Sequence, residues 1–376
     1  MKYFIIAGEA SGDLHGSNLM KQIQQLDPQA QFLGFGGDRM ISNGLTAIKH
    51  IKDLAFMGFI EVVKNLSTIK KNLRLCESEI IKFQPDAVIF IDYPGFNLRI
   101  AKAIRELKAR KFYYISPTVW AWKKSRIQII RNYIDKLYVI LPFEKDFYLE
   151  NNYNAEFLGH PLLDAISVKK KAKTSKKFIE NNKLSEKPIV ALLPGSRHQE
   201  LSKMLPVMLQ VAERFSDYQY VIAGAPGLQH DDYRRYLANS DIQLVFDQTY
   251  TLLENSLAAI VTSGTATLET AIYGVPELVC YKTSKINFLI AKALVNVKYI
   301  SLVNLIMDQE IVREFIQTDC TVDNLSRELE KLLFDELYRK EMKVHFGDLY
   351  KRLGGPGTSG RIAASILNSL QKVSSI

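Results

Sequence analysis

The stretch that decides the fold class is AVIFI at residues 87–91, followed at once by DYPGFN at residues 92–97. Five consecutive apolar residues without polar alternation are typical of a strand that is buried on both faces, as strands of parallel sheets are. Open parallel α/β sheets bind their ligands at the carboxyl ends of the strands. The stretch therefore predicts a parallel α/β sheet with the carboxylate of Asp92 at its ligand-binding edge.

Similar apolar runs recur along the chain in two series, with segments of helical pattern between them. The runs lie at residues 3–6, 87–91, 112–115, 137–141 and 156–158 in the first half, and at residues 189–193, 220–223, 243–246, 258–261 and 277–281 in the second. Their spacing leaves room for crossover helices. The sequence thus predicts a parallel α/β layout that occurs twice.

A change of composition marks the border between the two series. Residues 167–187 contain eight lysines and few large apolar residues, which is typical of a solvated linker with an exposed helix. An anion-binding role is the alternative. We therefore expect an N-terminal domain over 1–166, a lysine-rich linker over 167–187 and a second domain over 188–350. A glycine-rich turn then leads into a C-terminal helical segment over 351–376.

Length, charge and cysteine usage exclude several protein classes. The 376 residues suffice for two to three domains, and 49 Lys and Arg against 40 Asp and Glu leave a net charge of +9 that suits an anionic partner. The three cysteines have no Cys-x-x-Cys spacing and fit a reducing compartment. The N-terminal apolar run is too short for a signal peptide, and no run approaches the ~20 residues of a membrane span. We expect a soluble protein or one that lies on a membrane.

Two polar turns follow strands of the first half. The turn GEASGD at 8–13 combines glycines with the acids Glu9 and Asp13, but it is neither a dinucleotide fingerprint nor a nucleophile elbow. Nearby His15 is interpreted as an ordinary helix-face residue. Asp92 has two interpretations, a cap of the following helix or a general base whose pKa is raised by burial. Position alone does not separate them.

Two loops of the second half have the composition of phosphate-binding loops. Residues 194–197, PGSR, follow the run at 189–193, and residues 262–267, TSGTAT, follow the run at 258–261 and open a helix that contains Glu269. Glycine permits close approach, arginine can donate twice to a phosphate, and a helix N-terminus favours an anion. Such residues also simply cap helices, but two loops at strand ends predict a nucleoside-diphosphate site. No P-loop and no ligand cluster is present, so no metal or other cofactor is expected.

Two apolar segments are open to two interpretations. Residues 54–75 show an amphipathic helical pattern beside the bulky Phe56, Met57 and Phe59, and Trp120 and Trp122 stand next to a basic cluster. Core packing is the ordinary interpretation of both segments. A surface that faces lipid or an anionic rim is the other.

Nine strings, in this order, resemble the lipid-A-disaccharide synthase family of inverting GT-B glycosyltransferases. They are GEASGD (8–13), LAFMGFIEV (54–62), IDYPGFN (91–97), SPTVWAW (116–122), LPFEKDFY (141–148), FLGHPLLD (157–164), LLPGSRHQE (192–200), SGTATLE (263–269) and YISLVNLI (299–306). The resemblance implies two Rossmann-like parallel-sheet domains that face each other across a cleft. It also implies the transfer of a sugar from UDP-2,3-diacylglucosamine to 2,3-diacylglucosamine 1-phosphate (lipid X). The products would be UDP and a β-1,6-linked disaccharide 1-phosphate for lipid A biosynthesis.

The resemblance also assigns residues. Asp92 would be the catalytic base and Glu9 would face the reacting sugars. Matching positions place the UDP-sugar donor against Gly195, Ser196, Arg197, Glu200, Ser263, Gly264, Thr265, Thr267, Glu269 and Asn304. Acceptor or lipid would face Ser11, Phe56, Met57, Phe59, Trp120 and Trp122. The sequence departs from the family pattern at Gly95, where many members have a second acid, and at Val303, where proline is common.

The family works at the cytoplasmic face of the inner membrane of Gram-negative bacteria, which implies peripheral membrane association here. It also implies that the C-terminal segment returns to the first domain and can support a homodimer. The nearest rival is a UDP-N-acetylglucosamine 2-epimerase on the same architecture. A nucleic-acid-binding protein fits poorly, because no such motif appears and basic residues are dispersed outside the linker. A scaffold role fits poorly with so many polar loops at strand ends.

Overall fold

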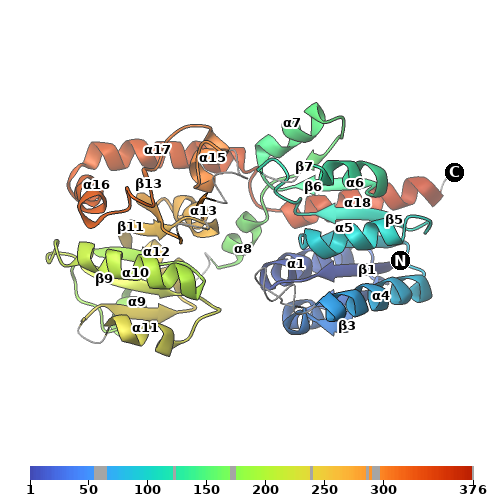
Figure 1. The fold of residues 1–376 in the computed structure, drawn as a ribbon, viewed down its shortest axis with the longest axis horizontal. Helices are drawn as coiled ribbons and strands as arrows, with labels where there is room; N and C mark the ends of the chain where they lie inside the picture. Colours follow the sequence, from blue (N-terminus) through green and yellow to red (C-terminus); the bar gives the residue numbers. More distant parts are fainter. Residues whose placement is uncertain are drawn as a thin grey trace. The chain divides into compact units, whose positions relative to one another are not determined.

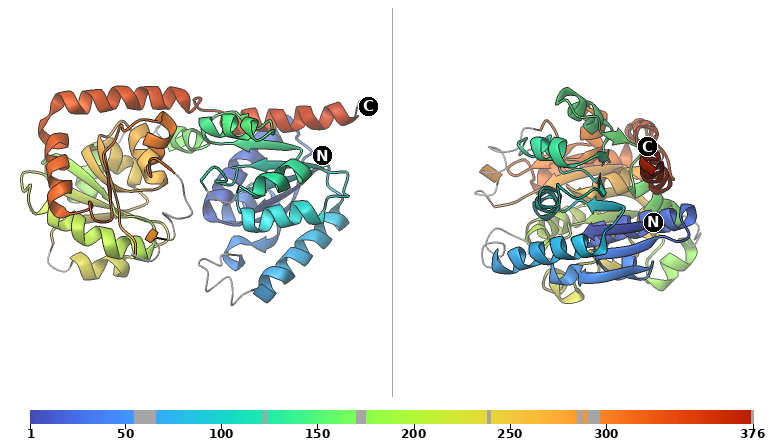
Figure 2. Two further views of the ribbon diagram at one scale, coloured as in Figure 1. Left: turned by 45° about the horizontal axis from the view of Figure 1, so that its top comes forward. Right: turned by 90° about the vertical axis from the view of Figure 1, so that its right-hand side faces the viewer.

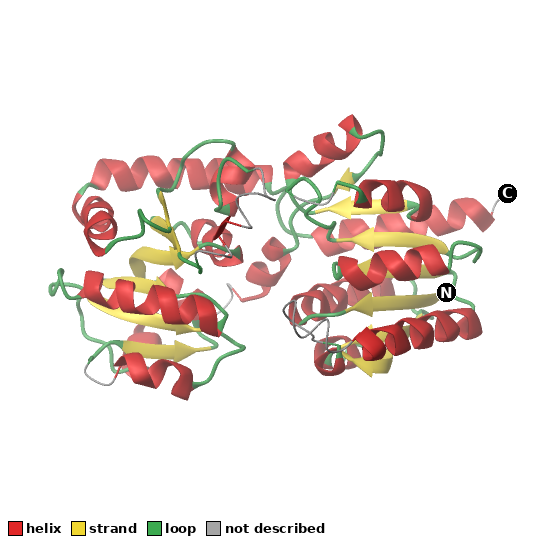
Figure 3. Cartoon of the chain, viewed as in Figure 1, coloured by secondary structure: helices red, strands yellow, loops and turns green. Residues whose placement is uncertain are grey.

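The computed structural model describes residues 1–54, 66–121, 124–169, 175–237, 240–284, 288–289 and 297–374 of the chain (Figure 1). The chain forms two compact units: unit 1 comprises residues 1–164 and 354–376, and unit 2 comprises residues 165–353. In each unit, helices cover both faces of a parallel sheet (Figure 3). The two parallel α/β domains predicted from the apolar runs are confirmed.

Unit 1 is built on a parallel sheet of order β3-β2-β1-β4-β5-β6-β7. Its strands are β1 (Lys2–Ala7), β2 (Gln31–Gly36), β3 (Leu45–His50), β4 (Ala87–Ile91), β5 (Arg110–Tyr114), β6 (Lys136–Val139) and β7 (Glu156–Phe157). Its helices are α1 (Ala10–Leu26), α2 (Asp38–Ile41), the 3₁₀ turn η1 (Ile51–Asp53), α4 (Leu66–Phe83), α5 (Pro94–Ala103), α6 (Arg126–Tyr133), α7 (Pro142–Glu150) and α18 (Thr358–Ser374). Helix α8 (Leu162–Lys169) crosses from unit 1 into unit 2.

Alternate side chains of the unit 1 strands fill two separate cores. Phe4, Val88 and Phe90 pack with side chains of α4, α5 and α6 on one face. Tyr3, Ile89 and their neighbours pack with α1 and α18 on the other face. Because every strand of the centre is buried on both faces, the continuous apolar runs of the sequence are explained.

Helix α18 comes from the far end of the chain and packs beside α1 in unit 1 (Figure 2). Its buried apolar side chains are Ile362, Ala363, Ile366, Leu367 and Leu370. Burial of a large aliphatic side chain contributes roughly 1.5–3 kcal/mol. Asp164 accepts hydrogen bonds at the start of this helix from the backbone N–H groups of Gly357 (2.6 Å), Thr358 (3.1 Å) and Ser359 (2.8 Å).

Unit 2 is built on a parallel sheet of order β10-β9-β8-β11-β12-β13. Its strands are β8 (Ile189–Leu193), β9 (Gln219–Gly224), β10 (Gln243–Phe246), β11 (Ser256–Thr262), β12 (Glu277–Tyr281) and β13 (Glu314–Ile316). Its helices are α9 (Ser175–Asn181), α10 (His198–Ala212), α11 (His230–Leu237), α12 (Thr249–Glu254), α13 (Thr265–Ile272), α15 (Leu302–Met307), α16 (Val322–Phe334) and α17 (Glu336–Arg352).

The lysine-rich segment is less exposed than its composition suggests. The units divide at 164/165, so this segment lies in unit 2. Its helix α9 places Phe178 and Ile179 against β8, β9 and α12, and Phe178 is only 2% exposed. The expected exposed helix thus has one docked side, because two apolar residues among the lysines suffice to hold it on the sheet.

The ten runs predicted as strands correspond to ten observed strands, whereas β2, β3 and β13 were not predicted. Strand β2 carries glycines at positions 34 and 36, β3 is an edge strand with a single buried residue, and β13 has only three residues. None of these presents a continuous apolar run. Of the amphipathic pattern over 54–75, the structure describes helix α4 from Leu66 onward; residues 55–65 lie outside the described part.

No helix among the described residues is both long enough and apolar enough to cross a bilayer.

Candidate functional site

A cavity of about 590 Å³ opens in unit 2 at the carboxyl ends of β8, β9 and β11. Both loops predicted to bind phosphate border it. Its lining comprises Leu193, Gly195, Ser196, Arg197, Glu200, Ala223, Gly224, Ala225, Pro226, Thr249, Thr262, Ser263, Gly264, Thr265, Ala266, Glu269, Tyr281 and Ile300. The predicted loops thus share one concave site at the edge where parallel sheets bind ligands.

The loop after β8 is held by Glu200 from the first turn of α10. The Glu200 carboxylate accepts a hydrogen bond from the backbone N–H of Ser196 (2.9 Å) and lies 3.8 Å from the Arg197 guanidinium. Gly195 has a φ of 104°, and a Cβ there would lie 2.6 Å from the Glu200 side chain. The loop therefore requires glycine. The Arg197 side chain is 73% exposed beside the cavity, which suits it to an incoming anion.

The loop after β11 brings the N-terminus of α13 to the same cavity. Ser263 donates its hydroxyl to the carbonyl of Ile300 (2.8 Å), and Gly264 and Thr265 are exposed. Glu269, one turn into α13, accepts a hydrogen bond from the Tyr250 hydroxyl (2.8 Å). A helix N-terminus attracts a phosphate, and a carboxylate beside it can accept from sugar hydroxyls.

Two residues assigned to UDP by the resemblance have structural roles instead. The Thr267 side chain is buried and donates its hydroxyl to the carbonyl of Gly264 (2.9 Å), within the first turn of α13. The Asn304 side chain is 0% exposed; it donates to Val312 and Glu314 (2.8 Å each) and accepts from the N–H groups of Ile311 (2.7 Å) and Val312 (3.0 Å). Neither residue lines the cavity. Asn304 already uses both donors and both acceptor positions, so this structure does not support direct UDP contacts by these two side chains.

In unit 1, the backbone after β4 holds Asp92 in a strained conformation. Asp92 and Tyr93 have φ of 45° and 48°, in the left-handed region. The Asp92 carbonyl accepts hydrogen bonds from the Tyr113 hydroxyl (2.6 Å) and the Asn97 side-chain amide (2.7 Å). The cap position of α5 belongs to Tyr93 and not to Asp92. The helix-cap interpretation of Asp92 is therefore wrong.

Burial and, after it, the negative charge of Glu9 raise the pKa of Asp92 to about 6. A backbone hydrogen bond from Tyr93 and the charge of Arg126 partly oppose this rise in pKa. At neutral pH the carboxylate is therefore unprotonated but much more basic than an exposed aspartate. A group with these properties is suited to general base catalysis.

The GEASGD turn packs directly against the Asp92 loop. A Cβ on Gly8 would clash with the ring of Tyr93, so only glycine permits this approach. Glu9, at the N-cap of α1, and Ser11 are exposed. Asp13 is 4% exposed and accepts from the N–H groups of Gly37, Arg39 and Met40, so it fixes the start of α2.

Of the remaining predicted residues, the structure describes His15 and Trp120. Burial lowers the pKa of His15 to about 4, so its ring is neutral at pH 7. Trp120 is part-buried and donates its indole N–H to Glu144 (3.2 Å). Phe56, Met57, Phe59 and Trp122 lie outside the described residues.

Sequence reasoning missed the residues that support the site. Tyr113 and Asn97 hold the Asp92 backbone, Tyr250 contacts Glu269, and Glu144 contacts Trp120. In the sequence these polar side chains stand inside apolar strands or ordinary helices. The signal that could have found them is a tyrosine, asparagine or glutamate at a position where the periodicity requires a buried residue.

The two parallel α/β units define a two-domain protein of the GT-B architecture, with a cavity at the strand ends of its second unit. Over 98–99% of its length the chain is similar to UDP-bound MnaA of S. aureus (TM-score 0.68, 13% identity, 97% of that chain) and to the calicheamicin glycosyltransferase CalG4 (TM-score 0.58, 13% identity, 98% of that chain). It is likewise similar to the UDP-GlcNAc 2-epimerase of Neisseria meningitidis bound to UDP-GlcNAc (TM-score 0.64, 13% identity, 100% of that chain). At such identities these likenesses show the fold alone.

Sequence comparison is more specific. Residues 3–355 match the profile of the lipid-A-disaccharide synthetase family. The lipid-A-disaccharide synthases of Geobacter sulfurreducens and Coxiella burnetii are each 34% identical to it, over 99% and 97% of this chain and 98% and 97% of those proteins. The chain belongs to the lipid-A-disaccharide synthetase family and is a glycosyltransferase of lipid A biosynthesis.

Proposed function

We propose that this chain transfers the sugar of UDP-2,3-diacylglucosamine to 2,3-diacylglucosamine 1-phosphate, with inversion at the anomeric carbon. The observation that carries the proposal is the convergence of two anion-binding loops on one cavity of unit 2. Family membership supplies the reaction, and the cavity supplies the place for its nucleotide.

The UDP moiety would occupy the unit 2 cavity. The exposed guanidinium of Arg197 and the N-terminus of α13 at Thr265 are the sources of positive potential there, and Glu269 is the acceptor for a ribose hydroxyl. Negative charge develops on the diphosphate as the bond to the sugar breaks. The same groups therefore stabilise the leaving group more strongly in the transition state than in the ground state.

Asp92 would act as the base. Its carboxylate takes the proton of the acceptor 6-hydroxyl while that oxygen forms a bond to the anomeric carbon of the donor. The bond between this carbon and the diphosphate oxygen breaks in the same displacement, and UDP leaves with the electron pair. A pKa of about 6 lets Asp92 be unprotonated at neutral pH yet accept a proton.

The departure at Gly95 is compatible with this mechanism. Gly95 is exposed, and a Cβ there would meet nothing within 4 Å among the described residues. Glu9 is the acid whose charge acts on Asp92. We propose that Asp92 works with Glu9 as an acidic neighbour.

We propose that the reaction requires no metal ion. No group of three or more His, Cys, Asp or Glu side chains in the described part of the chain is arranged to hold one. Arg197 and the helix N-terminus would carry the electrostatic role instead. Activity should survive EDTA; loss of activity that magnesium restores would contradict this part of the proposal.

We also propose that the protein acts at the cytoplasmic face of the inner membrane of a Gram-negative bacterium, as a peripheral protein. Both substrates carry acyl chains, and the net charge of +9 favours an anionic lipid surface. A homodimer through the C-terminal segment is part of this proposal, and the mass of the protein in solution tests it.

The decisive experiment combines the purified protein with UDP-2,3-diacylglucosamine, with and without 2,3-diacylglucosamine 1-phosphate. Disaccharide 1-phosphate and UDP that appear only with acceptor would support the proposal. Release of UDP or an epimerised sugar without acceptor would favour the 2-epimerase alternative, whose fold is the same. Mass spectrometry distinguishes these products.

A further inference from the structure

We propose that Glu144 is a positioning residue that sets the indole ring of Trp120 beside the acceptor side of Asp92. The structural part of this proposal, that Glu144 fixes the position of Trp120, stands on the contacts of unit 1. The kinetic part, that this position affects binding of the acceptor, rests on the function proposed above. Nothing in the sequence pattern assigns this glutamate a role.

Glu144 uses its two carboxylate oxygens for different purposes. One oxygen accepts the backbone N–H groups of Ile140 (3.1 Å) and Leu141 (2.9 Å), as expected for a glutamate in the first turn of α7. The other oxygen accepts the hydroxyl of Ser116 (2.7 Å) and the indole N–H of Trp120 (3.2 Å). Helix capping alone would leave this second oxygen to solvent. Instead, it accepts both of its hydrogen bonds from the loop after β5.

Because Glu144 is buried, its carboxylate depends on protein donors for its hydrogen bonds. Glu144 is 1% exposed, and a buried carboxyl is tolerated only when its oxygens find hydrogen-bond donors. All four donors converge on it from two loops, the one after β5 and the one after β6. Removal of the carboxylate would therefore release Ser116 and Trp120 together.

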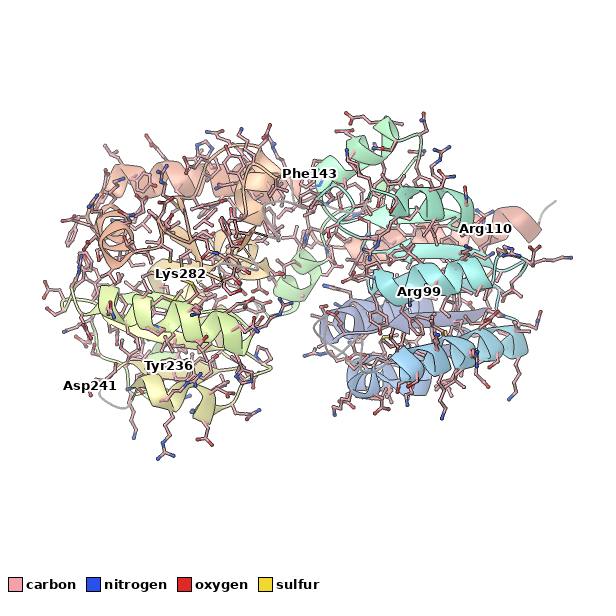
Figure 4. The ribbon with its side chains drawn as sticks, viewed as in Figure 1. Arg99, Arg110, Phe143, Tyr236, Asp241 and Lys282 are labelled. Atoms are coloured by element: carbon pink, nitrogen blue, oxygen red, sulfur yellow. The ribbon has the colours of Figure 1, made fainter. Side chains whose placement is uncertain are left out.

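The Trp120 ring is fixed from a second side by Phe143, the residue before Glu144. The ring centroids are 5.0 Å apart and the planes meet at 89°, an edge-to-face contact. Figure 4 labels Phe143 in unit 1 at the start of α7. Because Trp120 is held at its nitrogen by Glu144 and at its ring by Phe143, its orientation is defined by consecutive residues of α7.

The topology places this cluster next to Asp92. Strands β4, β5 and β6 are neighbours in the sheet, and Asp92, Ser116 and Ile140 follow their respective carboxyl ends. Tyr113 at the end of β5 donates its hydroxyl to the carbonyl of Asp92 (2.6 Å). Glu144 thus ties together the loops of the two strands that follow β4, at the edge where the acceptor hydroxyl must reach Asp92.

The position of Trp120 can be read directly, because the chain contains only two tryptophans. In a Trp122→Phe background, the emission of the protein comes from Trp120. We expect Glu144→Ala to shift this emission to the red and to increase its quenching by acrylamide. Glu144→Gln should have a smaller effect, since its amide oxygen can still accept from the indole.

The kinetic test uses the chain with Trp122 intact. Glu144→Ala should raise KM for the acceptor about tenfold, as expected for loss of a hydrogen bond to a charged group, with KM for the donor changed less than about twofold. Trp120→Phe should raise KM for the acceptor similarly. Because both changes break one contact, the double variant Glu144→Ala with Trp120→Phe should be little worse than Trp120→Phe.

Glu328 offers a matched control in unit 2. It is 5% exposed and accepts hydrogen bonds from the Tyr338 hydroxyl (2.6 Å) and Lys331 (3.0 Å). Glu328→Gln should lower stability without changing Trp120 emission or KM for the acceptor.

Unchanged emission in folded Glu144→Ala, or in Glu144→Gln if the alanine variant does not fold, would overturn the structural part. Equal rises in both KM values, or additive effects in the double variant, would overturn the kinetic part. If the parent chain makes no disaccharide, the proposed function fails while the emission result still decides the position of Trp120.

Discussion

At the scale of single residues, Asp92 combines backbone strain with a raised pKa. Two consecutive residues in the left-handed region cost of order 1 kcal/mol each, so the surrounding contacts must hold them. Tyr113 and Asn97 do so through the Asp92 carbonyl, which leaves the carboxyl group itself to other partners. A strained residue that carries a perturbed carboxyl at a sheet edge is the pattern expected of a catalytic position.

Asp92→Asn should lower turnover by about 10²–10⁴-fold, because the amide cannot accept the proton of the acceptor hydroxyl. UDP binding, measured by calorimetry, should persist. In the parent protein the carboxyl must be unprotonated to act, and burial raises its pKa to about 6. The value of kcat/KM should therefore rise with pH through about 6 and then level off. Near-normal turnover of the variant would exclude Asp92 as the base.

Arg197→Ala should weaken UDP binding by about tenfold or more, because a hydrogen bond to a charged group contributes about 1.5–3 kcal/mol. Isothermal titration calorimetry measures this affinity directly. Arg214 is a suitable control: it is also exposed, lies in unit 2 and pairs with Asp323 (2.7 Å), but it does not line the cavity. If Arg197→Ala and Arg214→Ala bind UDP equally well, Arg197 does not contact the diphosphate.

Glu277 predicts a pH dependence of stability. Its side chain is 0% exposed at the start of β12, neither carboxyl oxygen has a hydrogen-bond partner among the described residues, and burial raises its pKa well above the ordinary value. A pKa raised in the folded state means that stability is greatest below the unfolded pKa and falls as pH rises toward the folded pKa. The free energy of unfolding lost is about 1.4 kcal/mol per pH unit over that window.

Glu277→Gln should remove this loss, because glutamine has no proton to release. The variant should be more stable than the parent protein, and the difference in free energy of unfolding should grow from pH 5 to pH 8. Urea unfolding followed by circular dichroism measures it. Glu213→Gln, at an exposed position, is the control and should show no such growth. A constant difference across this pH range would mean that Glu277 ionises normally.

At the scale of secondary-structure elements, the caps of α17 and α18 test the division into units. Asp164 accepts three backbone N–H groups at the start of α18, and Asp335 accepts the N–H of Tyr338 in the first turn of α17. Replacement of a capping aspartate by alanine costs about 0.5–2 kcal/mol. Asp164→Ala should speed amide hydrogen exchange in α18 and leave α17 unchanged, and Asp335→Ala should do the reverse. Faster exchange in both helices of either variant would contradict the independence of the two units.

Elements also show where sequence reasoning succeeds and where it fails. The apolar runs of β4 and β8 identify central strands because such strands are buried on both faces. Edge strand β3 has no such run, since only Leu45 of its six residues is buried. At the site, glycine and arginine signal a phosphate loop directly. Asn304 looks the same in sequence whether it binds a ligand or closes a loop, and only its hydrogen bonds decide between the two.

At the scale of the whole molecule, the excess of basic residues predicts that membrane binding depends on lipid charge and on salt. With a net charge of +9, binding to vesicles that contain phosphatidylglycerol should exceed binding to phosphatidylcholine vesicles. Binding measured by cosedimentation should fall as salt rises from 0.05 M to 0.5 M, because the Debye length shrinks to a few ångströms. If binding is the same for both kinds of vesicle and does not change with salt, apolar contacts alone account for membrane association.

The return of α18 to unit 1 has a consequence for synthesis on the ribosome. Residues 354–376 are translated after all of unit 2, yet they cover the sheet face of unit 1 that α1 leaves open. Until they emerge, Phe112, Tyr114 and Tyr138 lack part of their apolar cover. Unit 2 can therefore complete its fold while the nascent N-terminal unit still exposes a hydrophobic surface, the reverse of the usual order in which the first-made domain matures first. For the length of one domain's translation, that surface is available to chaperones and to premature association with neighbouring chains.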